Sequence, residues 1–307
     1  MKTVALVKDR NKFWTVYKEE LEHYNVKVDL FDIWQKSEQD RLLSRHYDAF
    51  IWRAKHNPDI KNLAKRFIYL FDKVLHIPTY PSWDSYWHYD DKIAQHYLFQ
   101  KLEVPTVPTH LFYNKEEALE FCRKAEYPMI YKCAHGAGSS NVGLLKNTKH
   151  AKNYINKAFG KGIKTYFKSE VQKGYVYFQD FLPNNEGDYR IVCDSRLAYG
   201  FFRRNRKNEP FASGTADKEY NELPENVLNV AFDTHNRMGF DIMSYDLLRN
   251  RSNEWVITEI SAVFGDLNLM KYHYYLKTDE GWNRNPMDEN VSQMAITHMI
   301  KNVWKWV

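Results

Sequence analysis

The stretch "YKCAHGAGSSNVGLL", residues 131–145, decides the fold class of this chain. Three glycines and two serines lie within residues 136–143, and an apolar, strand-like segment stands on each side of them, at 128–134 and 142–147. Strand, glycine loop and strand in this order predict a β-hairpin. Glycines let backbone N–H groups approach an anion closely, and serine hydroxyls add further donors. From the loop alone two interpretations stay open, a phosphate-binding hairpin or a flexible turn.

Two better-known glycine loops do not match this hairpin, because both run from a strand into a helix. A P-loop has lysine followed by serine or threonine after its last glycine, and no such pair follows Gly143. A dinucleotide-binding loop ends in glycine or alanine, whereas "GAGSSN" ends in Asn141. The stretch therefore predicts neither of these nucleotide sites.

Before the hairpin, three short apolar runs alternate with two segments of helical spacing. The runs cover residues 3–7, 26–31 and 47–53, and the helical segments cover residues 11–24 and 62–76. Alternation of this kind is typical of a parallel sheet with helices packed against it. The first block of the chain, residues 1–85, is therefore predicted to be a small parallel-sheet domain.

The remainder of the chain mixes further helices with strands and turns. Asp90 or Asp91 can cap a helix that runs to about Leu102. The other predicted elements are helices at 114–125, 227–239 and 289–307, strands within 174–182 and 188–205, and a hairpin of 242–250 with 254–261. The whole pattern predicts a protein of mixed α/β and α+β class.

Composition and charge exclude several classes of protein. Hydrophobic residues make up 44% and charged residues 27% of the 307 residues, an ordinary globular balance. The net charge of +5 comes without a long run of lysine and arginine, so we expect no nucleic-acid partner. The three cysteines are odd in number and show no zinc-binding spacing. Because no apolar run is long enough for a signal peptide or a membrane span, we expect a cytoplasmic protein.

Two lysines stand where an anion would stabilise them. Lys132 lies on the strand that enters the glycine loop, and Lys92 lies at the start of the helix capped by Asp90 or Asp91. A buried lysine is costly unless it meets an anion or a carboxylate. Each lysine therefore has two open interpretations, a phosphate contact or a solvent-facing side chain.

Polar residues also lie within the predicted strands that follow the hairpin. Gln179 and Asp180 end a strand rich in aromatic residues, where they either hold a planar base or ribose or lie on an ordinary exposed face. Asp188 and Arg190 share one face of the next strand because they are two residues apart, and Arg203 follows across a turn. Arginine on a rigid strand suits phosphate, and a solvated basic hairpin is the alternative.

Asp246 and Glu259 are the most specific pair in the sequence. They lie in the two strands of a predicted hairpin, within the apolar segments "MSYDLL" and "VITEIS". Two carboxylates that face each other repel unless a cation lies between them. Oxygen ligands of this kind favour magnesium, which also keeps nucleotide phosphates as ligands. The alternative is a pair of acids that face lysine or arginine, and we favour the metal.

The order of these residues along the chain resembles the ATP-grasp superfamily over roughly residues 86–265. It looks closest to the carboxylate–amine ligases, such as the glutamate ligases that modify ribosomal proteins and the ATP-grasp proteins associated with polysaccharide genes. The resemblance implies a small N-terminal pre-ATP-grasp domain (1–85) followed by a two-lobed ATP-grasp domain (86–307), with a lid lobe at about 106–182.

The resemblance also implies a role for each candidate residue. Lys92 and Lys132 would contact ATP phosphates or adenine. The phosphates would be covered by Gly136, Gly138, Ser139 and Ser140. Adenine would be held by Gln179, Asp180, Phe181 and Leu182, with Asp188 near the ribose. Arg190 and Arg203 would act as catalytic residues at the transferred phosphate or the acyl phosphate. Mg²⁺ would be bound by Asp246, Glu259 and Ser261.

Three departures from the family pattern stand in this chain. Asp180 is shorter than the glutamate usual at its position, and residues 210–215 lack the usual arginine and asparagine. Ser261 stands where the family places a metal-binding asparagine. A hydroxyl is a weaker magnesium ligand than an amide oxygen, so these residues put the second metal ion in doubt.

The resemblance implies an enzyme that activates a substrate carboxylate as an acyl phosphate and couples it to an amine, releasing ADP and phosphate. Its substrates would be small carboxylates and amines, carbohydrate-linked or peptidic. For His135 and His273 two interpretations stay open, a contact with a substrate or a solvent-facing side chain. Two alternatives remain, a small-molecule kinase on the same fold and a nucleotide-binding scaffold protein without turnover.

Overall fold

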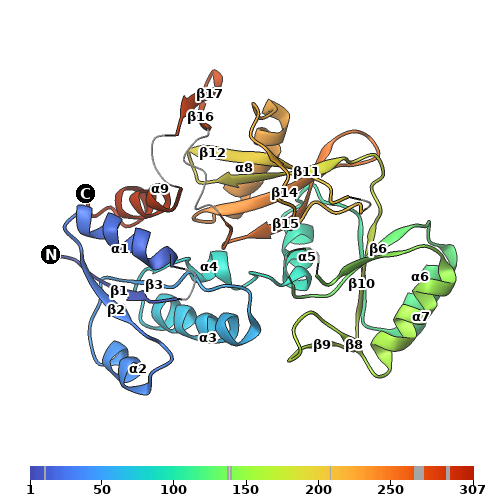
Figure 1. Cartoon of the computed structure of the whole chain (residues 1–307), viewed down its shortest axis with the longest axis horizontal. Coiled ribbons are helices and arrows are strands. Elements are labelled where there is room, and N and C mark those ends of the chain that lie inside the picture. The colour runs from blue at the N-terminus through green and yellow to red at the C-terminus, as the bar shows by residue number, and fades with distance from the viewer. Residues whose placement is uncertain (10–11, 137, 139, 208, 266–272, 288–290) are drawn as a thin grey trace.

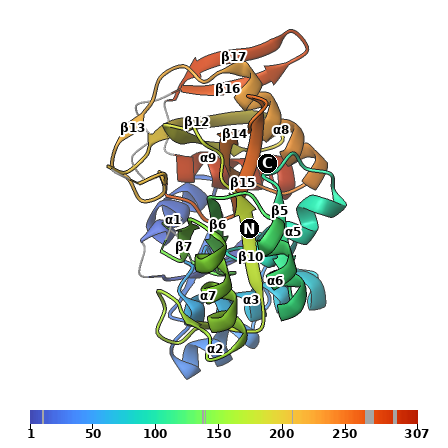
Figure 2. The ribbon, with the colours of Figure 1, turned by 90° about the vertical axis from the view of Figure 1, so that its right-hand side faces the viewer.

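Three sheets form the framework of the molecule, each with helices packed on it. The computed structural model describes residues 1–307 except 10–11, 137, 139, 208, 266–272 and 288–290. We call the sheets the N-terminal sheet, the lid sheet and the central sheet. Figures 1 and 2 show the N-terminal sheet in blue to cyan, the lid sheet in green and the central sheet in yellow to red.

The N-terminal sheet is parallel, as the sequence predicts, with strand order β2-β1-β3-β4. Its strands are β1 (Thr3–Val7), β2 (Lys27–Phe31), β3 (Ala49–Ile51) and β4 (Thr79–Tyr80). The helices around it are α1 (Phe13–His23), α2 (Lys36–Leu43), α3 (Pro58–Tyr69) with its π-helical continuation η1 (Leu70–Val74), and α4 (Trp83–Tyr86). In Figure 1, α1 and α3 lie on opposite sides of the sheet, which explains why the side chains of β3 are buried in both directions.

The lid sheet is antiparallel, with strand order β5-β10-β6-β7. Its strands are β5 (Thr109–Phe112), β6 (Met129–Lys132), β7 (Val142–Leu145) and β10 (Val176–Asp180). Helices α6 (Lys115–Lys124) and α7 (Thr148–Phe159) cover one face, and the short pair β8 (Ile163–Lys164) and β9 (Val171–Gln172) follows α7. Strands β6 and β7 pair with Lys132 opposite Val142, so the predicted glycine hairpin is confirmed.

The central sheet carries the second predicted hairpin. Its strands are β11 (Gly187–Cys193), β12 (Leu197–Arg204), β13 (Lys218–Glu219), β14 (Met243–Arg249), β15 (Trp255–Ser261), β16 (His273–Thr278) and β17 (Gly281–Pro286). Helices α5 (Lys92–Lys101) and α8 (Glu225–Met238) pack against it. Strands β14 and β15 pair antiparallel and place Asp246 opposite Glu259, as predicted, beside an irregularity in the register.

The C-terminal segment returns to the N-terminal sheet. Helix α9 (Val291–His298) and the π-helical turn η2 (Met299–Val303) lie beside α1, and their buried residues share one apolar cluster with those of α1 and β1. The predicted helix at 289–307 is therefore present, although residues 289–290 lie outside the described part of the chain. A contact of 3.1 Å between Nδ1 of His298 and the carboxylate of Asp194 ties α9 to the turn between β11 and β12.

The apolar cores show how the parts are joined. The largest buried cluster combines side chains of the N-terminal sheet, such as Phe50 and Trp52, with side chains of the central sheet, such as Tyr245 and Ile257. The lid sheet has its own cluster, built within residues 112–178. The lid is thus a separately packed lobe, whereas the first 85 residues share their core with the central sheet. The predicted domain boundaries stay a prediction.

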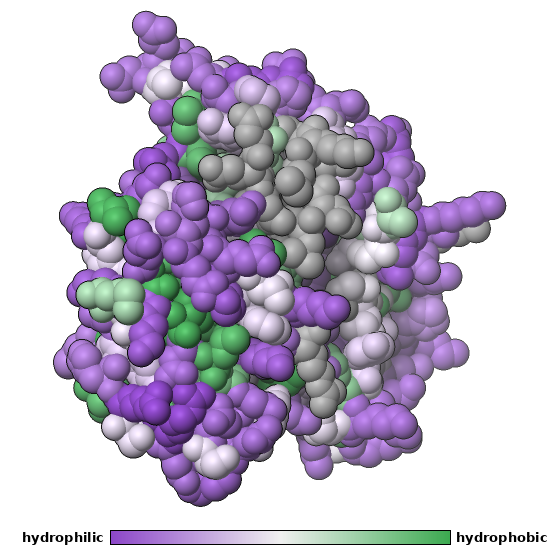
Figure 3. Space-filling view, turned by 60° about the vertical axis from the view of Figure 1, so that its left-hand side comes forward, coloured by the Kyte–Doolittle hydropathy of each residue, from purple (hydrophilic) through white to green (hydrophobic). Residues whose placement is uncertain are grey.

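The surface is ordinary for a folded protein of this composition. Figure 3 shows a face whose described residues are mostly hydrophilic, with apolar side chains in smaller patches. None of the helices in the described part of the chain combines the length and the hydropathy that a membrane-spanning segment requires.

Candidate active site

A cavity of about 950 Å³, counted with its open mouth, lies between the lid sheet and the central sheet. Residues from both sheets and from α5 line it, including most of those singled out from the sequence. The predicted residues on its walls are Lys92, Lys132, Gly136, Gln179, Asp180, Phe181, Leu182, Asp188, Asp246 and Glu259.

One part of the cavity wall is apolar and suits a planar group. It is formed by Val107, Ile130, Val142, Leu182 and Leu248, together with Phe181 and Phe211. Aliphatic and aromatic side chains that face each other across a narrow space favour a flat, weakly polar ligand. This wall lies next to the end of β10, where the sequence predicts contacts with a base.

The polar residues at the end of β10 are engaged by neighbours in the lid. Gln179 donates from Nε2 to Thr109 Oγ1 over 3.0 Å, and Asp180 Oδ1 lies 3.2 Å from Nε2 of His110. The backbone N–H of Asp180 donates to Pro108 over 3.0 Å. The side chains of Gln179 and Asp180 therefore have protein partners. A base in the cavity would pack mainly against the apolar wall.

Lys132 enters the cavity from β6 and is the cation best placed to receive an anion. In the described part of the chain its ammonium has no hydrogen-bond or ion-pair partner, and the side chain is half-buried. Burial lowers the pKa of Lys132 to about 8, with Glu259 opposing the shift and Lys92 adding to it. An incoming phosphate would supply the missing counter-charge.

Lys92 bridges the glycine hairpin and the central sheet. It begins α5, whose N-cap is Asp91; that carboxylate accepts from the N–H groups of the following helical turn over 3.2 and 3.0 Å. The Lys92 ammonium donates to the carbonyl of Gly136 over 2.9 Å and to Glu259 over 3.2 Å. Burial alone would lower the pKa of Lys92, but the nearby carboxylates outweigh it and raise that pKa.

The carboxylates of the central sheet face arginine and lysine side chains. For Asp246 and Glu259 this arrangement is the alternative that the sequence left open beside a metal site. Arg190 donates to both oxygens of Asp246, each over 2.8 Å, and Arg203 donates to Asp246 over 2.8 Å. Arg203 also donates to both oxygens of Asp188, each over 2.7 Å. Burial opposes the charge on Asp246, yet the two guanidinium groups outweigh it and hold the pKa of Asp246 well below its usual range.

Two predicted residues, Asp188 and Ser261, have protein partners that differ from their predicted ligands. Asp188, implied near the ribose, has both oxygens bonded to Arg203 and therefore orients that arginine. Ser261, implied as a metal ligand, donates to the carbonyl of Val263 over 2.6 Å and accepts from its N–H over 3.3 Å. The Ser261 hydroxyl thus closes its own turn, which does not support its use as a third metal ligand.

A magnesium site would rest on the two remaining carboxylates. Among the described residues no group of three or more His, Cys, Asp and Glu side chains is arranged to hold a metal ion. Asp246 and Glu259 nevertheless lie opposite each other and line the cavity, and hard oxygen donors suit Mg²⁺ that is also bound by phosphates. They fit an ion that arrives with a nucleotide better than an ion held by protein alone.

A second cavity adjoins the first and is distinctly polar. It shares Ser213, Asp246 and Glu259 with the first cavity, and its volume is about 820 Å³ with its mouth included. Its walls add His56, Tyr89, Asp90, Gly138, Arg190, Arg203, Gly214 and Ser261. A group held here would lie beside the arginines and at the far side of the carboxylates from the apolar wall.

Some predicted residues are not brought to either cavity. Ser140 is exposed and is not part of either wall, and Ser139 lies outside the described residues. His273 lies on β16, 3.1 Å from Arg284, rather than at the site. His135 lies near the hairpin but contacts Glu170 over 3.1 Å.

Several residues in or near the site were not predicted from the sequence. Asn205, Phe211 and Ala212 line the first cavity from the loop after β12. Lys218 pairs with Arg203 across β12 and β13; burial, then Arg190 and Arg203, lowers its pKa. The strand pairing places Lys218 directly opposite Arg203 in the central sheet. The segment around Lys218 is polar and short, so only the pairing of β13 with β12 reveals it.

The comparisons with known proteins agree with this architecture. The family described as the ATP-binding domain of the carbamoyl-phosphate synthase L chain matches residues 91–195. The α-aminoadipate–LysW ligase LysX of Saccharolobus solfataricus is 22% identical over 176 residues, which are 57% of this chain and 62% of that protein. The match thus spans less than two thirds of that relative's length.

Many solved structures share the fold, and the following two are examples. D-cycloserine synthetase DcsG has a TM-score of 0.64 at 13% identity, covering 98% of this chain and 99% of that one. The ATP-grasp ligase PsnB, described as complexed with minimal precursor, Mg and ADP, has a TM-score of 0.57 at 13% identity, covering 86% and 89%. The fold has two lobes, with the first cavity between them. Residues 91–195 are thus similar to an ATP-binding domain, and the chain shares its fold with solved ATP-grasp ligases.

Proposed function

We propose that the protein is an ATP-dependent carboxylate–amine ligase that releases ADP and phosphate. One observation carries the proposal above the others. Lysines of both lobes, Lys132 from the lid and Lys92 from α5, meet the carboxylates and arginines of the central sheet in one continuous pair of cavities. That arrangement suits a triphosphate at the boundary and an acidic substrate beyond it.

The nucleotide would lie in the first cavity. Its base would pack against the apolar wall beside Leu182, and its phosphates would extend toward Lys132 and Lys92. Mg²⁺ would be held by Asp246 and Glu259 together with the phosphates, balancing charge on the transferred group. Relatives named as ligases, and a fold neighbour described with Mg and ADP, support Mg²⁺ and a nucleotide as ligands in this proposal.

The carboxylate substrate would lie in the second cavity, beside Arg190 and Arg203. One of its oxygens attacks the γ-phosphorus of ATP, the bond to the bridging oxygen breaks, and ADP leaves. An amine then attacks the carbonyl carbon of the acyl phosphate, loses a proton, and expels inorganic phosphate. The arginines would hold the negative charge that gathers on the transferred phosphoryl group, so positioning and electrostatics supply most of the catalysis.

The chemical identity of the substrates forms the finer part of the proposal. Fold neighbours are described with peptide substrates and as makers of small molecules. The polar walls and the half-buried His56 of the second cavity suit a small carboxylate with further polar groups. We propose small-molecule carboxylates and amines, carbohydrate-linked or peptidic, as the substrates.

The decisive experiment traps the activated acid. The protein is incubated with Mg-ATP, hydroxylamine and pools of carboxylic acids, including amino acids and sugar acids, and both ADP and hydroxamate are measured. We expect hydroxamate in step with ADP for at least one pool. A phosphorylated product without hydroxamate would instead establish a kinase.

Two variants make the assay specific. Glu259→Gln removes the charge of a proposed metal ligand and should abolish both products. Glu254→Gln, an exposed position just before β15, should leave both unchanged. Equal activity in the two variants would contradict the assigned role of Glu259.

A further inference from the structure

The peptide group of Gly136, at the base of the glycine hairpin, is held from both sides. Its N–H donates to Asp90 Oδ1 over 2.8 Å, and its carbonyl accepts from Lys92 over 2.9 Å. Gly136 has a φ of +125°, so this backbone conformation suits glycine. Both partners lie at the start of α5, outside the lid sheet, so the hairpin is attached to a part of the molecule that does not belong to its own lobe.

Asp90 is itself fixed by a residue of the N-terminal sheet region. Lys61 on α3 donates to Asp90 Oδ2 over 2.8 Å and to the Asp90 carbonyl over 3.2 Å. Lys61 is 1% exposed and Asp90 4% exposed. Asp90 also has a φ of +48°, an uncommon conformation for a residue other than glycine. One carboxylate oxygen therefore faces α3 and the other faces the hairpin.

A buried ion pair of this kind contributes little net stability, because desolvation of both charges offsets their attraction. What such a pair does supply is a fixed geometry for the groups around it. Lys61 does not line either cavity, so it is not placed to touch a nucleotide or a substrate. Through Asp90, which also lines the second cavity, the contacts of Lys61 reach the Gly136 peptide.

We propose that Lys61 is a positioning residue: through Asp90 it fixes the Gly136 peptide and so sets the place of the glycine hairpin over the nucleotide phosphates. The inference rests on the proposed function, since it assigns phosphates to the space beneath the hairpin. Lys92 continues the chain of contacts from Gly136 to Glu259 over 3.2 Å. Helix α3 thus acts on the nucleotide site without touching it.

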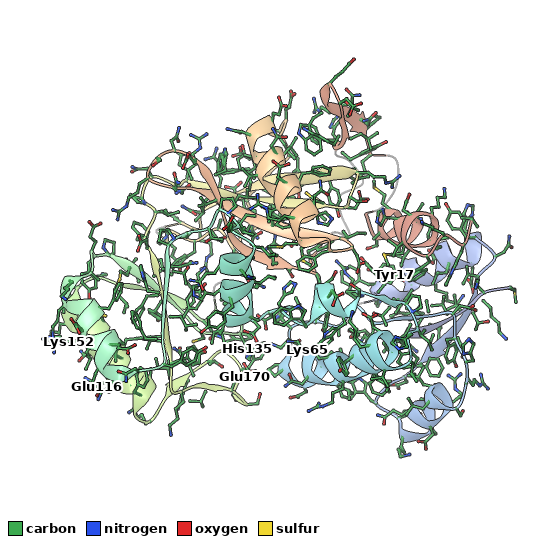
Figure 4. All side chains as sticks on the ribbon, turned by 180° about the vertical axis from the view of Figure 1, so that it is seen from behind. Tyr17, Lys65, Glu116, His135, Lys152 and Glu170 are labelled. Carbon is green, nitrogen blue, oxygen red and sulfur yellow. The ribbon has the colours of Figure 1, made fainter. Side chains whose placement is uncertain are left out.

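The same helix offers a matched control. Lys65 lies one helical turn beyond Lys61 and is half-buried, yet its ammonium has no ion pair or hydrogen bond in the described part of the chain. Figure 4 labels Lys65 on α3. Replacing Lys65 removes the same charge from the same helix while leaving the Asp90 contact in place.

The experiment compares Lys61→Met with Lys65→Met in two assays. Calorimetry gives the Kd of Mg-ADP, and ligand-observed NMR gives the affinity for adenosine, which lacks phosphates. For Lys61→Met we expect the Kd of Mg-ADP to rise about tenfold or more, with adenosine changed less than about twofold. A role in global stability alone would weaken both ligands alike. Lys65→Met should leave both within about twofold of the unmodified protein.

Hydrogen exchange of the ligand-free protein supplies the second readout. In Lys61→Met we expect amides of residues 133–136 to exchange about tenfold faster or more, while amides of β14 keep their protection. If a folded Lys61→Met variant keeps both the Mg-ADP affinity and the hairpin protection, the proposal is overturned. Should the unmodified protein fail to bind Mg-ADP, the proposed function fails, and the exchange comparison still decides whether Lys61 anchors the hairpin.

Lys61→Met leaves the Asp90 carboxylate buried without its cation, which can prevent folding. The double variant Lys61→Met/Asp90→Asn avoids a lone buried charge. We expect it to show the same selective loss of Mg-ADP affinity and the same faster hairpin exchange. Unmodified values of both in the folded double variant would equally overturn the proposal.

Discussion

Single residues at this site are defined by the partners that the fold brings to them. Lys132 and Lys92 both line the same cavity. Lys92 donates to the carbonyl of Gly136 and to the carboxylate of Glu259, whereas Lys132 has no such partner in the described part of the chain. Their pKa values consequently move in opposite directions, raised for Lys92 and lowered for Lys132. The residue with the lowered pKa is the one whose charge a ligand can change.

Nucleotide affinity should therefore depend on pH through Lys132. With a pKa of about 8 in the free protein, and a higher pKa once phosphate is bound, the complex holds more protons than its components. Affinity is then constant below that pKa and falls as pH rises through it, by about tenfold between pH 7 and pH 9. Calorimetry of Mg-ADP in two buffers of different ionisation enthalpy should show proton uptake near pH 8.

Lys132→Met is the control for that measurement. It should bind Mg-ADP more weakly at neutral pH and show neither the proton uptake nor the decline toward pH 9. A pH dependence that survives in Lys132→Met would assign the titration to another group.

Among the elements, the glycine hairpin depends on a few close contacts at its base. A Cβ on Gly136 would lie 2.5 Å from Asn141 Nδ2. Asn141 is not free to move, because its amide donates to the carbonyl of His135 over 2.8 Å and accepts from the N–H of Tyr166 over 2.7 Å. Asn141 thus holds the base of the hairpin together. It is the same residue that distinguishes the loop from a dinucleotide-binding loop, which has glycine or alanine there.

Gly136→Ala should destabilise the protein by about 2–3 kcal/mol, from backbone strain at φ +125° together with displacement of Asn141. Gly174→Ala is the matched comparison, since Gly174 has a φ of +80° and nothing within 4 Å of the added Cβ. It should cost about 1 kcal/mol. Urea unfolding of both variants tests the difference, and equal losses would show that Asn141 yields without cost.

At the scale of the whole molecule, the C-terminal segment packs against the N-terminal sheet and the central sheet. Helix α9 packs beside α1, and the buried pair of His298 with Asp194 ties it to the central sheet. Asp194 also accepts from the N–H groups of Arg196 and Leu197 over 2.7 and 2.9 Å. Burial opposes the charge on Asp194, but these partners outweigh it and lower its pKa.

Asp194→Asn should therefore reduce the free energy of unfolding by about 1–3 kcal/mol at neutral pH. Because the folded-state pKa of Asp194 is lowered, its contribution is present above the unfolded value near 4 and is lost as pH falls through the folded value. The gap between the two proteins should close in strong acid. Denaturant unfolding at pH 7 and below pH 4 measures it, and Asp233→Asn on the exposed face of α8 should show no gap at either pH.

Much of the framework was predictable because its signals are local. The parallel N-terminal sheet, the glycine hairpin and the pairing of Asp246 with Glu259 follow from apolar runs and turns that are close in the chain. Helix α7 was missed although Ala151, Tyr154, Ile155 and Ala158 recur at helical spacing, because lysines and asparagines surround them. The hairpin of β16 and β17 was missed as well, since aromatic and polar residues alternate there without an apolar run.

The sequence by itself determined the class of the protein and the cluster of residues at its site, because strand and helix periodicity and the order of charged residues are properties of neighbours in the chain. Only the tertiary structure decided the partners: that Arg190 and Arg203 face Asp246, that Lys61 reaches Asp90, and that the Ser261 hydroxyl turns to its own backbone. The physical reason is that a charge in a folded protein is stabilised by whichever groups packing brings within a few ångströms. Those groups come from segments far apart along the chain.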